Sequence, residues 1–427
     1  MKLGSSSVTM VVLVAALAVL AAACGGEKKA LPPPGEAAAA KGEGIMFKDD
    51  VEFLRQNTQV VVLSDPAGKA QVAVNPDLQG RVMTSTAGGP EGLSFGWINR
   101  ALLASKENNL HMNAFGGEDR FWLGPEGGQF GIFFKKGEPF DLDHWFTPPP
   151  LNEGAWDIAE QASDRITFKK AMTLVNSSGT VFDLEVSRTI ELVGDERMRS
   201  LASGVEGEIR SVGFVSKNEV KNIGSAAWTK ETGLLSIWIL GMFNPSPRTT
   251  IFLQFREGPE SELGPVVNDA YFGKVPSDRL VVDRARLTLF FNGDGEYRSK
   301  IGLSPKRATT VLGSYDAASG TLTLVTYGPF DPGNADYVNS MWEIQKNPYG
   351  GDVVNSYNDG PPSPGAKPLG PFYELETSSP ALALKPGESF VHTHTTLHFQ
   401  GSEKALDLVI GPGPVRIADI KNAFKPK

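Results

Sequence analysis

The stretches ITFKKAMTLVN, residues 166–176, and FDLEVSRTIELV, residues 182–193, decide the fold class. In both stretches apolar side chains alternate with polar ones, the period-two pattern of a β-strand with one buried face. Six further runs share this character and are bounded by Gly, Pro, Asn or Asp: QVVVLSD, KAQVAVNP, GRVMTST, TTIFLQF, RLTLFFN and GTLTLVTYG. Helical periodicity is weak, and we predict one short helix at residues 50–57 with Asp49 or Asp50 as its N-cap. The sequence therefore predicts an all-β fold.

Composition favours one large domain. The chain has 47 glycines and 30 prolines, as expected where many turns join short strands. Beyond residue 45, only residues 347–370, NPYGGDVVNSYNDGPPSPGAKPLG, have the composition of a linker, and we interpret them as a long functional loop. The alternative is a disordered insertion. No repeat of fixed period is visible, which argues against a propeller. We expect a single domain over residues 46–427, and a monomer.

The N-terminal segment predicts export and a lipid anchor. Residues 1–23 combine Lys2, an apolar run too short for an ordinary membrane span, and small residues before Cys24. This arrangement resembles a bacterial lipoprotein signal in which Cys24 is acylated; the alternative is an ordinary secretory signal. Residues 24–45 are rich in Gly, Ala, Pro and charge, as in a flexible tether. We expect a cell-envelope protein held to a membrane through Cys24. Because Cys24 is the only cysteine, disulfides and thiolate zinc sites are excluded.

Charge and motifs exclude several classes of function. The net charge is −8, with Lys and Arg dispersed among Asp and Glu, so nucleic-acid binding lacks its basic surface. The sequence contains no P-loop, dinucleotide fingerprint, HExxH or GxSxG motif. We therefore expect no cofactor.

The sharpest chemical signal is a histidine-rich strand, VHTHTTLHF, at residues 391–399. Alternation places His392, His394 and His398 on one face. Upstream, FYELET places Glu374 and Glu376 on one face of another strand, and KPGE at residues 385–388 suits a turn between the two. If these strands pair, imidazoles and carboxylates share one wall of a cleft, which suits proton transfer or metal ligation. The alternative is that half of these groups face solvent and hydrogen bonds satisfy the rest.

The block GGEDRFW, residues 116–122, predicts a polar bend beside an aromatic plate. Gly116 and Gly117 permit positive φ, and the block then brings two carboxylates, a guanidinium and an indole together. Such a set suits sugar binding, because CH groups stack on aromatic rings while hydroxyls bond to charged groups. The candidate residues are Glu118, Asp119, Arg120 and Trp122. The alternative is a structural ion pair between Arg120 and Glu118 or Asp119.

Three other segments carry weaker signals. The Pro-stiffened loop FDLDHWFTPPP, residues 140–150, presents His144 and Trp145 as a ligand rim, unless they simply pack the loop down. The segment VNSYNDG adds Asn355 and Tyr357, an amide and an aromatic ring that suit a carbohydrate. DGEY at residues 294–297 predicts a hairpin turn.

Several blocks together resemble a known superfamily. They include GRVMTSTAGG at residues 80–89, NLHMNAFGGEDRFW at residues 109–122, and GPFYELETSSPALALKPGESFVHTHT at residues 370–395. Their order resembles the galactose mutarotase-like superfamily, the β-supersandwich fold of aldose epimerases. More closely, the chain resembles an uncharacterised bacterial family within it, whose members often carry lipid anchors.

The resemblance implies paired acid–base chemistry on a neutral sugar. In mutarotases a carboxylate removes the proton of the anomeric hydroxyl, and a histidine gives a proton to the ring oxygen. His111 is the nearest match to the early family histidine, and Arg81 lies in the early Gly-Arg strand. Glu374 and Glu376 are positional candidates for the late glutamate. His392 and His394 complete the predicted catalytic set.

Three functions remain open at this point. The first is an envelope lipoprotein that binds a carbohydrate and carries out epimerase-type chemistry. The second is a non-catalytic glycan-binding lipoprotein with the same cleft. The third is a metal-dependent carbohydrate enzyme with His392, His394 and a glutamate as ligands, although we expect no metal site.

Overall fold

The computed structural model describes residues 44–201, 209–333 and 336–424. Residues Gly44–Lys427 form one compact unit. The predicted signal peptide, Cys24 and nearly all of the predicted tether lie outside the described residues, so the division of the chain at residue 45 stays a prediction. Within the described ranges, no helix is both long enough and apolar enough to cross a membrane.

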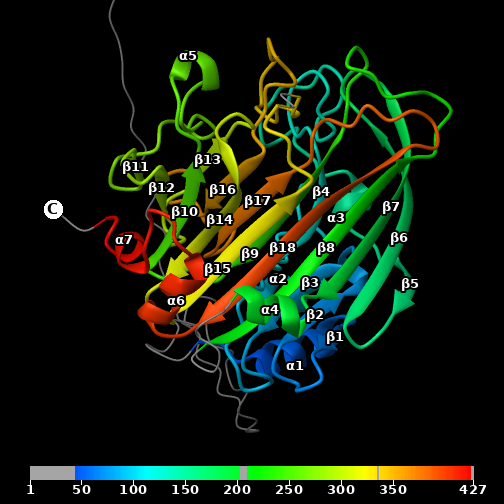
Figure 1. Ribbon diagram of the computed structural model, residues 1–427. Coiled ribbons are helices and arrows are strands. Elements are labelled where there is room, and N and C mark those ends of the chain that lie inside the picture. The colour runs from blue at the N-terminus through cyan, green and yellow to red at the C-terminus, as the bar shows by residue number, and fades with distance from the viewer. Residues whose placement is uncertain (1–43, 202–208, 334–335, 425–427) are drawn as a thin grey trace, which may run out of the picture. The chain divides into compact units, whose positions relative to one another are not determined.

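The largest element is a ten-stranded antiparallel sheet, whose long strands run side by side in Figure 1. The two stretches that decide the fold class form β6 and β7, paired from Arg165↔Glu191 to Val175↔Val181. In spatial order the strands are β11 (Leu280–Asp283), β12 (Thr288–Asn292), β10 (Thr249–Phe255), β14 (Ala308–Asp316), β15 (Thr321–Gly328), β18 (Ser389–Gln400), β8 (Arg210–Asn222), β7 (Val181–Leu192), β6 (Arg165–Val175) and β5 (Asp157–Gln161).

Two smaller antiparallel sheets complete the described strands. The five-stranded sheet has the order β13 (Ser299–Leu303), β16 (Val354–Asn358), β17 (Tyr373–Ser378), β9 (Ser236–Phe243) and β4 (Arg120–Gly124). The three-stranded sheet has the order β1 (Val61–Ser64), β2 (Gln71–Asn75) and β3 (Arg81–Thr86). The predicted all-β class with few short helices is confirmed, and all eight runs quoted above form strands.

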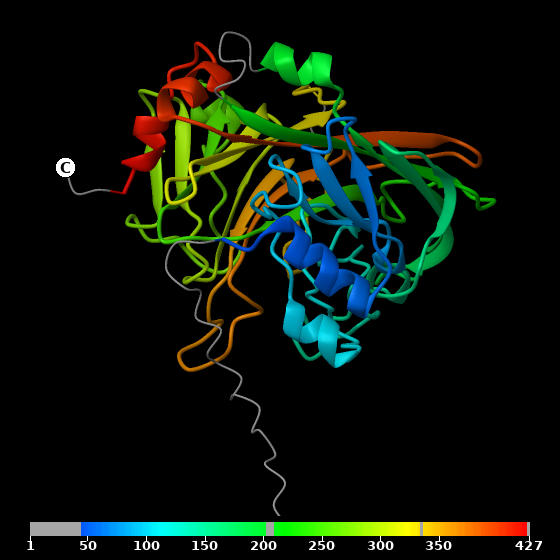
Figure 2. The same cartoon turned by 90° about the horizontal axis from the view of Figure 1, so that it is seen from below.

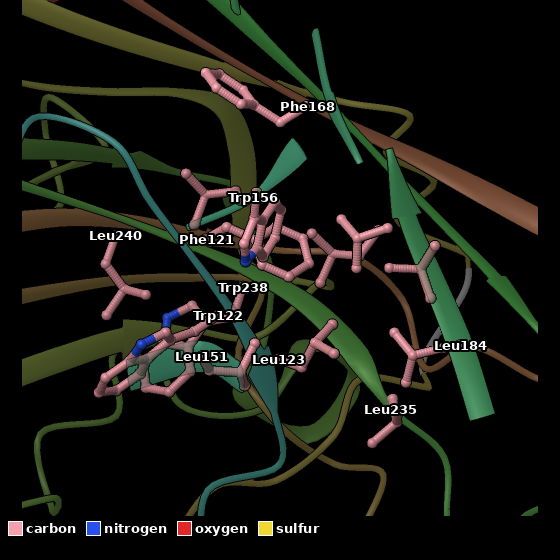
Figure 3. Packing of buried hydrophobic residues seen from close by; sticks show 14 of the residues in the cluster. Phe121, Trp122, Leu123, Leu151, Trp156, Phe168, Leu184, Leu235, Trp238 and Leu240 are labelled. Atoms are coloured by element: carbon pink, nitrogen blue, oxygen red, sulfur yellow. The ribbon is translucent and has the colours of Figure 1, made fainter. Parts of the chain in front are cut away.

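The core lies between the five-stranded and ten-stranded sheets. Phe121 and Leu235 belong to the same buried cluster as Phe168 and Leu184 of β6 and β7 (Figure 3). Trp156 meets the Phe121 ring edge-on at 5.4 Å between centroids. Each fully buried ring of this kind contributes about 1.5–3 kcal/mol relative to an exposed one. One face of the five-stranded sheet is thus buried in the core, and its other face lines the cavity described below.

Short helices cover the edges of this arrangement. Met198 and Leu406 pack on the outer face of the ten-stranded sheet, and α6 and α7 lie on the other side of that sheet from α1 (Figure 2). The helices are α1 (Phe47–Asn57), the 3₁₀ turn η1 (Pro76–Leu78), α2 (Arg100–Ser105), α3 (Pro149–Asn152), α4 (Asp195–Leu201), α5 (Glu260–Leu263), α6 (Glu403–Ile410) and α7 (Ile417–Lys421).

Three local predictions are wrong. Helix α1 begins at Phe47 and has no side-chain cap, because Asp50 is buried and instead binds Arg100 at 2.6 Å and Ser94 at 2.5 Å. Residues 347–370 are not one loop, since they contain the buried strand β16. The turn at residues 294–297 is not a hairpin, because it joins β12 and β13, which lie in different sheets.

Candidate functional site

The free face of the five-stranded sheet forms the floor of a cavity of about 560 Å³. Every strand of this sheet contributes residues to the lining. Arg298, the residue just before β13, contributes as well. Loops between residues 109 and 145 and between residues 338 and 369 form the walls. The floor residues that line the cavity are Arg120, Trp122 and Gly124 of β4; Ser236, Trp238, Leu240 and Met242 of β9; Glu374 and Ser378 of β17; Asn355 and Tyr357 of β16; and Arg298 and Lys300 at β13.

The register of the strands sets opposite charges diagonally across this floor. Tyr357 pairs with both Lys300 and Glu374, and Glu376 pairs with Leu240, which also pairs with Arg120. Because alternate residues of a strand share a face, Glu374 and Glu376 both point away from the core. Each glutamate therefore lies within reach of a cation on a neighbouring or next-neighbouring strand.

One buried ion pair and one longer contact result. The Lys300 ammonium donates to Glu376 Oε2 at 2.9 Å, and the Trp238 indole N–H donates to the same oxygen at 2.9 Å. Arg120 lies 3.4 Å from Glu374, a longer contact. Glu376 is fully buried behind the cavity surface, whereas Glu374 lines the cavity. Glu376 is thus a fixed carboxylate, while Glu374 is accessible to a ligand.

The two accessible glutamates have raised pKa values. Burial raises the pKa of Glu374 to about 8, and the negative charge of Glu376 adds to this. Burial also raises the pKa of Glu126 to about 7, against the opposing effect of Lys300. Glu374 therefore holds its proton at neutral pH, and Glu126 titrates there.

Lys300 is the electrostatic centre of the floor. Burial opposes its charge, but three neighbouring carboxyl groups outweigh this effect and the net change raises its pKa. These carboxyl groups belong to Glu376, Glu126 and Glu374. A stable ammonium at this point holds the neighbouring carboxyl groups in place.

One side of the cavity is an indole wall. Trp122 lies 5.5 Å from Trp238 and 6.4 Å from Trp145, between ring centroids, and Trp145 stacks with Trp342 at 6.0 Å. The Arg120 guanidinium lies 3.9 Å from the Trp122 ring centroid, a cation–π contact that fixes its plane. This wall offers flat apolar surfaces directly beside charged groups.

The opposite side carries two tyrosine–aspartate pairs. The Tyr271 hydroxyl donates to Asp352 at 2.7 Å and accepts from Asn355 at 3.1 Å. The Tyr357 hydroxyl donates to Asp359 at 2.7 Å. Burial raises the pKa of both aspartates. This side therefore offers amide, hydroxyl and carboxyl groups at fixed positions.

His111 lines the cavity from the wall. Its Nδ1 lies 2.5 Å from the backbone oxygen of Trp145, and its ring stacks on Phe146 at 4.1 Å. A carbonyl oxygen only accepts, so Nδ1 carries a hydrogen and Nε2 of the neutral ring holds a lone pair. The contact fixes both the tautomer and the orientation of the ring.

The cavity brings together seven of the residues predicted from the sequence: His111, Arg120, Trp122, Trp145, Asn355, Tyr357 and Glu374. Glu376 lies directly behind them. The predicted positive φ of Gly116 and Gly117 is confirmed, at 91° and 108°. His144 lies instead on the exposed loop, bonded to Asp141 at 2.6 Å.

Other predicted substrate-binding residues lie inside the fold, away from the cavity. Glu118 accepts from the Ser85 backbone and from His398, and Asp119 pairs with buried Arg188 at 2.5 Å. Arg81 donates to the backbone oxygen of Gly116. The structural alternative for the bend is also wrong, because Arg120 pairs with neither Glu118 nor Asp119. Strand alternation explains this: after the bend, successive side chains point to opposite faces of β4.

The strand with Glu374 and Glu376 does not pair with the histidine-rich strand, so the condition for a shared wall of imidazoles and carboxylates is not met. β17 pairs with β16 and β9, whereas β18 pairs with β15 and β8 in the other large sheet. His392, His394 and His398 do share one face, as predicted, but that face is turned into the space between the sheets. The Thr377 hydroxyl contacts His392 Nε2 and His394 Nδ1, both at 2.9 Å.

His392 and His394 are neutral core groups. Burial lowers the pKa of His392 to about 3 and of His394 to about 4. Glu374 and Glu376 point away from these histidines, because they lie on the face of β17 opposite to Thr377. Among the described residues, no group of three or more His, Cys, Asp and Glu side chains is placed to hold a metal ion.

Several residues of the site were not predicted as site residues, among them Glu126, Trp238, Lys300 and Tyr271. Trp238 lies in a run that looks entirely apolar, SIWILGMF, where only alternation separates cavity-facing from core-facing residues. Lys300 follows the turn after DGEY and looked like an ordinary strand cation. No local signal links these residues, since four different strands and loops bring them together.

Comparison with known proteins now gives the family. A family model described as "Family of unknown function (DUF6786)" matches residues 45–424. The chain belongs to this family. A comparison with curated protein sequences gives no match.

Solved structures give distant similarities over most of the chain. A putative aldose 1-epimerase from Escherichia coli K12 has 14% identity and a TM-score of 0.48, covering 81% of this chain and 99% of that one. A galactose mutarotase-like protein from Lactobacillus casei has 10% identity and a TM-score of 0.43, covering 80% and 100%. A putative mutarotase from Salmonella typhimurium has 11% identity and a TM-score of 0.42, covering 81% and 92%. The predicted membership of an uncharacterised family is confirmed, and the predicted likeness to mutarotase-like structures is found again here.

Proposed function

We propose that this protein binds a saccharide in the cavity and transfers protons to and from it. The feature that carries the proposal is Glu374, a buried carboxyl group beside the Lys300–Glu376 ion pair on the floor of an indole-walled cavity, where burial raises its pKa to about 8. A neutral acid at pH 7 is poised to give a proton to an oxygen atom, which an ordinary surface glutamate is not.

The walls suit a sugar ring. A pyranose has apolar CH faces and an equator of hydroxyl groups. The indole wall matches the faces, and the Tyr–Asp pairs with Asn355 match the hydroxyls. A purely apolar ligand would cover these groups without using their remaining hydrogen-bond donors and acceptors.

Anomerisation is the reaction that these groups support best. Glu374 gives its proton to the ring oxygen while the ionised Glu126 takes the proton of the anomeric hydroxyl. The bond between the anomeric carbon and the ring oxygen breaks, and a carbonyl forms at that carbon. Rotation and closure return both protons. Nε2 of His111 is the second lone pair on the cavity surface available for the accepting role.

Arg120 adds a preference for an acidic sugar. Because Glu374 is neutral at pH 7 and lies 3.4 Å away, the guanidinium charge is not fully compensated by it. A uronic-acid carboxylate would supply the missing partner. We therefore expect uronic acids to bind more tightly than the matching neutral aldoses.

Exchange NMR on a panel of aldoses and uronic acids tests the proposal, because it reports binding and anomer interconversion together. Glu374→Gln and Glu126→Gln should each lower the interconversion rate by about 10²–10⁴-fold and change affinity little. His111→Ala separates the two candidate acceptors. The matched control is Glu257→Gln, an exposed carboxylate outside the cavity.

The results of these measurements distinguish a catalytic function from glycan binding alone. Interconversion that survives Glu374→Gln unchanged would refute the assigned proton donor. Binding without interconversion would select the non-catalytic glycan-binding function. No binding across the panel would remove saccharides from consideration. We also propose, from the N-terminal sequence alone, that Cys24 carries lipid and holds the protein at the cell envelope.

A further inference from the structure

Large apolar side chains stand exposed around the mouth of the cavity. Leu142, Phe272 and Leu369 line the cavity and yet are 56%, 45% and 49% exposed. A single exposed apolar residue needs no explanation, but three from separate loops around one opening form a surface that water covers unfavourably.

Charged groups are therefore buried at the floor of the cavity, and large apolar side chains stand exposed at its mouth, where Asn109 and Lys367 are also exposed. Arg120 is 3% exposed and Glu374 is 6% exposed, and with Lys300 they form the floor. This order is the reverse of a simple apolar pocket with a polar rim. It fits a ligand with a polar head that enters first and an apolar portion that stays at the opening.

The loops that carry the apolar residues are anchored. The Phe272 ring meets Tyr357 edge-on at 5.9 Å, and the Arg298 guanidinium lies 4.0 Å from its centroid. Leu369 precedes Gly370, whose backbone N–H donates to Asp359 at 2.8 Å. An added Cβ on Gly370 would lie 2.1 Å from the Trp97 ring, so this loop is pressed against the body of the protein.

Leu142 is held in the same way. It follows Asp141, whose carboxylate accepts from the backbone N–H of His144 at 3.1 Å and also binds the ring of that residue. The three side chains are thus presented at fixed positions by structured loops. Their exposure is a property of the folded cavity mouth.

We infer that the cavity also binds glycosides with an apolar aglycone: the sugar occupies the cavity, and the aglycone lies on Leu142, Phe272 and Leu369. This inference rests on the proposed saccharide binding and not on the proposed anomerisation, because a glycoside has no anomeric hydroxyl group and is not a substrate of that reaction. It goes beyond the proposed binding by assigning the second half of the bound ligand. Alkyl and aryl aglycones share the required chemistry.

Calorimetry with a series of glycosides tests the inference. The methyl, butyl, hexyl and phenyl glycosides of the best-bound sugar are compared below their aggregation concentrations. A buried methylene contributes up to roughly fourfold in affinity, so a hexyl chain that is partly covered should bind at least about tenfold more tightly than methyl. A gain confined to alkyl chains indicates a lipid-like aglycone, and a gain confined to phenyl indicates an aromatic one.

The variant Leu142→Ser/Phe272→Ser/Leu369→Ser should abolish the gain, so that its hexyl and methyl glycosides bind within about twofold of each other. Leu408→Ser, at an equally exposed leucine of α6, is the matched control and should keep the gain. Equal affinity for methyl, hexyl and phenyl glycosides in the wild type would overturn the inference, as would a gain that survives in the triple variant. Failure of every methyl glycoside to bind is a different result. It removes the proposed saccharide site, and this inference with it.

Discussion

Replacing Glu374 by Gln should make the protein more stable in mild alkali. The wild-type carboxyl group is buried beside Glu376, which raises its pKa from 4.5 to about 8. Glutamine has nearly the shape of the protonated acid but cannot ionise. The variant should therefore match the wild type near pH 5 and exceed it near pH 8.

The sign follows from proton binding. Between pH 4.5 and about 8 the folded protein keeps the Glu374 proton, whereas the unfolded chain releases it. The unfolded state therefore binds fewer protons, and wild-type stability falls as pH rises through this window. One pKa unit corresponds to about 1.4 kcal/mol, so the loss between pH 5 and pH 8 is about 3 kcal/mol. Glu126 acts in the same direction, but it is present in both proteins and cancels in the comparison.

Urea unfolding of both proteins at pH 5 and pH 8 measures this difference. Glu257→Gln serves as the control and should track the wild type at both pH values, since its side chain is exposed. The reasoning about the buried acid fails if the Gln variant gains no stability on the wild type between pH 5 and pH 8. The same result would remove the neutral proton donor from the proposed mechanism.

Three further predictions follow from other parts of the chain. Arg188→Met should destabilise the fold by about 3–5 kcal/mol in urea unfolding, because it leaves Asp119 buried without its cation. The control Lys217→Met, on the surface of the neighbouring strand, should cost less than about 1 kcal/mol, and equal losses would contradict this reasoning. Burial lowers the pKa of His392 to about 3, so the free energy of unfolding of the wild type falls as pH drops from 6.5 towards that value. His392→Gln should reduce this dependence on pH below 6.5, and an unchanged dependence would contradict the reasoning. Cys24→Ser should release soluble protein from membranes and abolish labelling by a palmitate analogue; unlabelled wild-type protein would exclude the anchor.

The cavity shows how far sequence reasoning reaches. Blocks quoted for their chemistry supplied His111, Arg120, Trp122 and Glu374, and the structure brings these four residues into one cavity. They were predictable because each stands out locally, as a lone histidine, a charge beside glycines or an acidic strand. Lys300 does not stand out, and its importance comes only from the three glutamates that surround it in space.

The histidine-rich strand shows where this reasoning stops. Alternation placed His392, His394 and His398 on one face, and this was right. It could not say what the face meets, because two strands joined by a short turn look the same whether they pair or enter different sheets. Here the ten residues after β17 carry the chain into the second sheet, and Thr377 meets the imidazoles from across the core.

By itself the sequence determined the all-β class, the positions of many strands and which side chains of a strand share one face. These properties depend on the two-residue period and on turn residues, which are local. Only the tertiary structure decided which faces meet. That choice depends on strand order, set by the burial of whole faces between two sheets, and it turned Glu374 towards the cavity and His392 into the core.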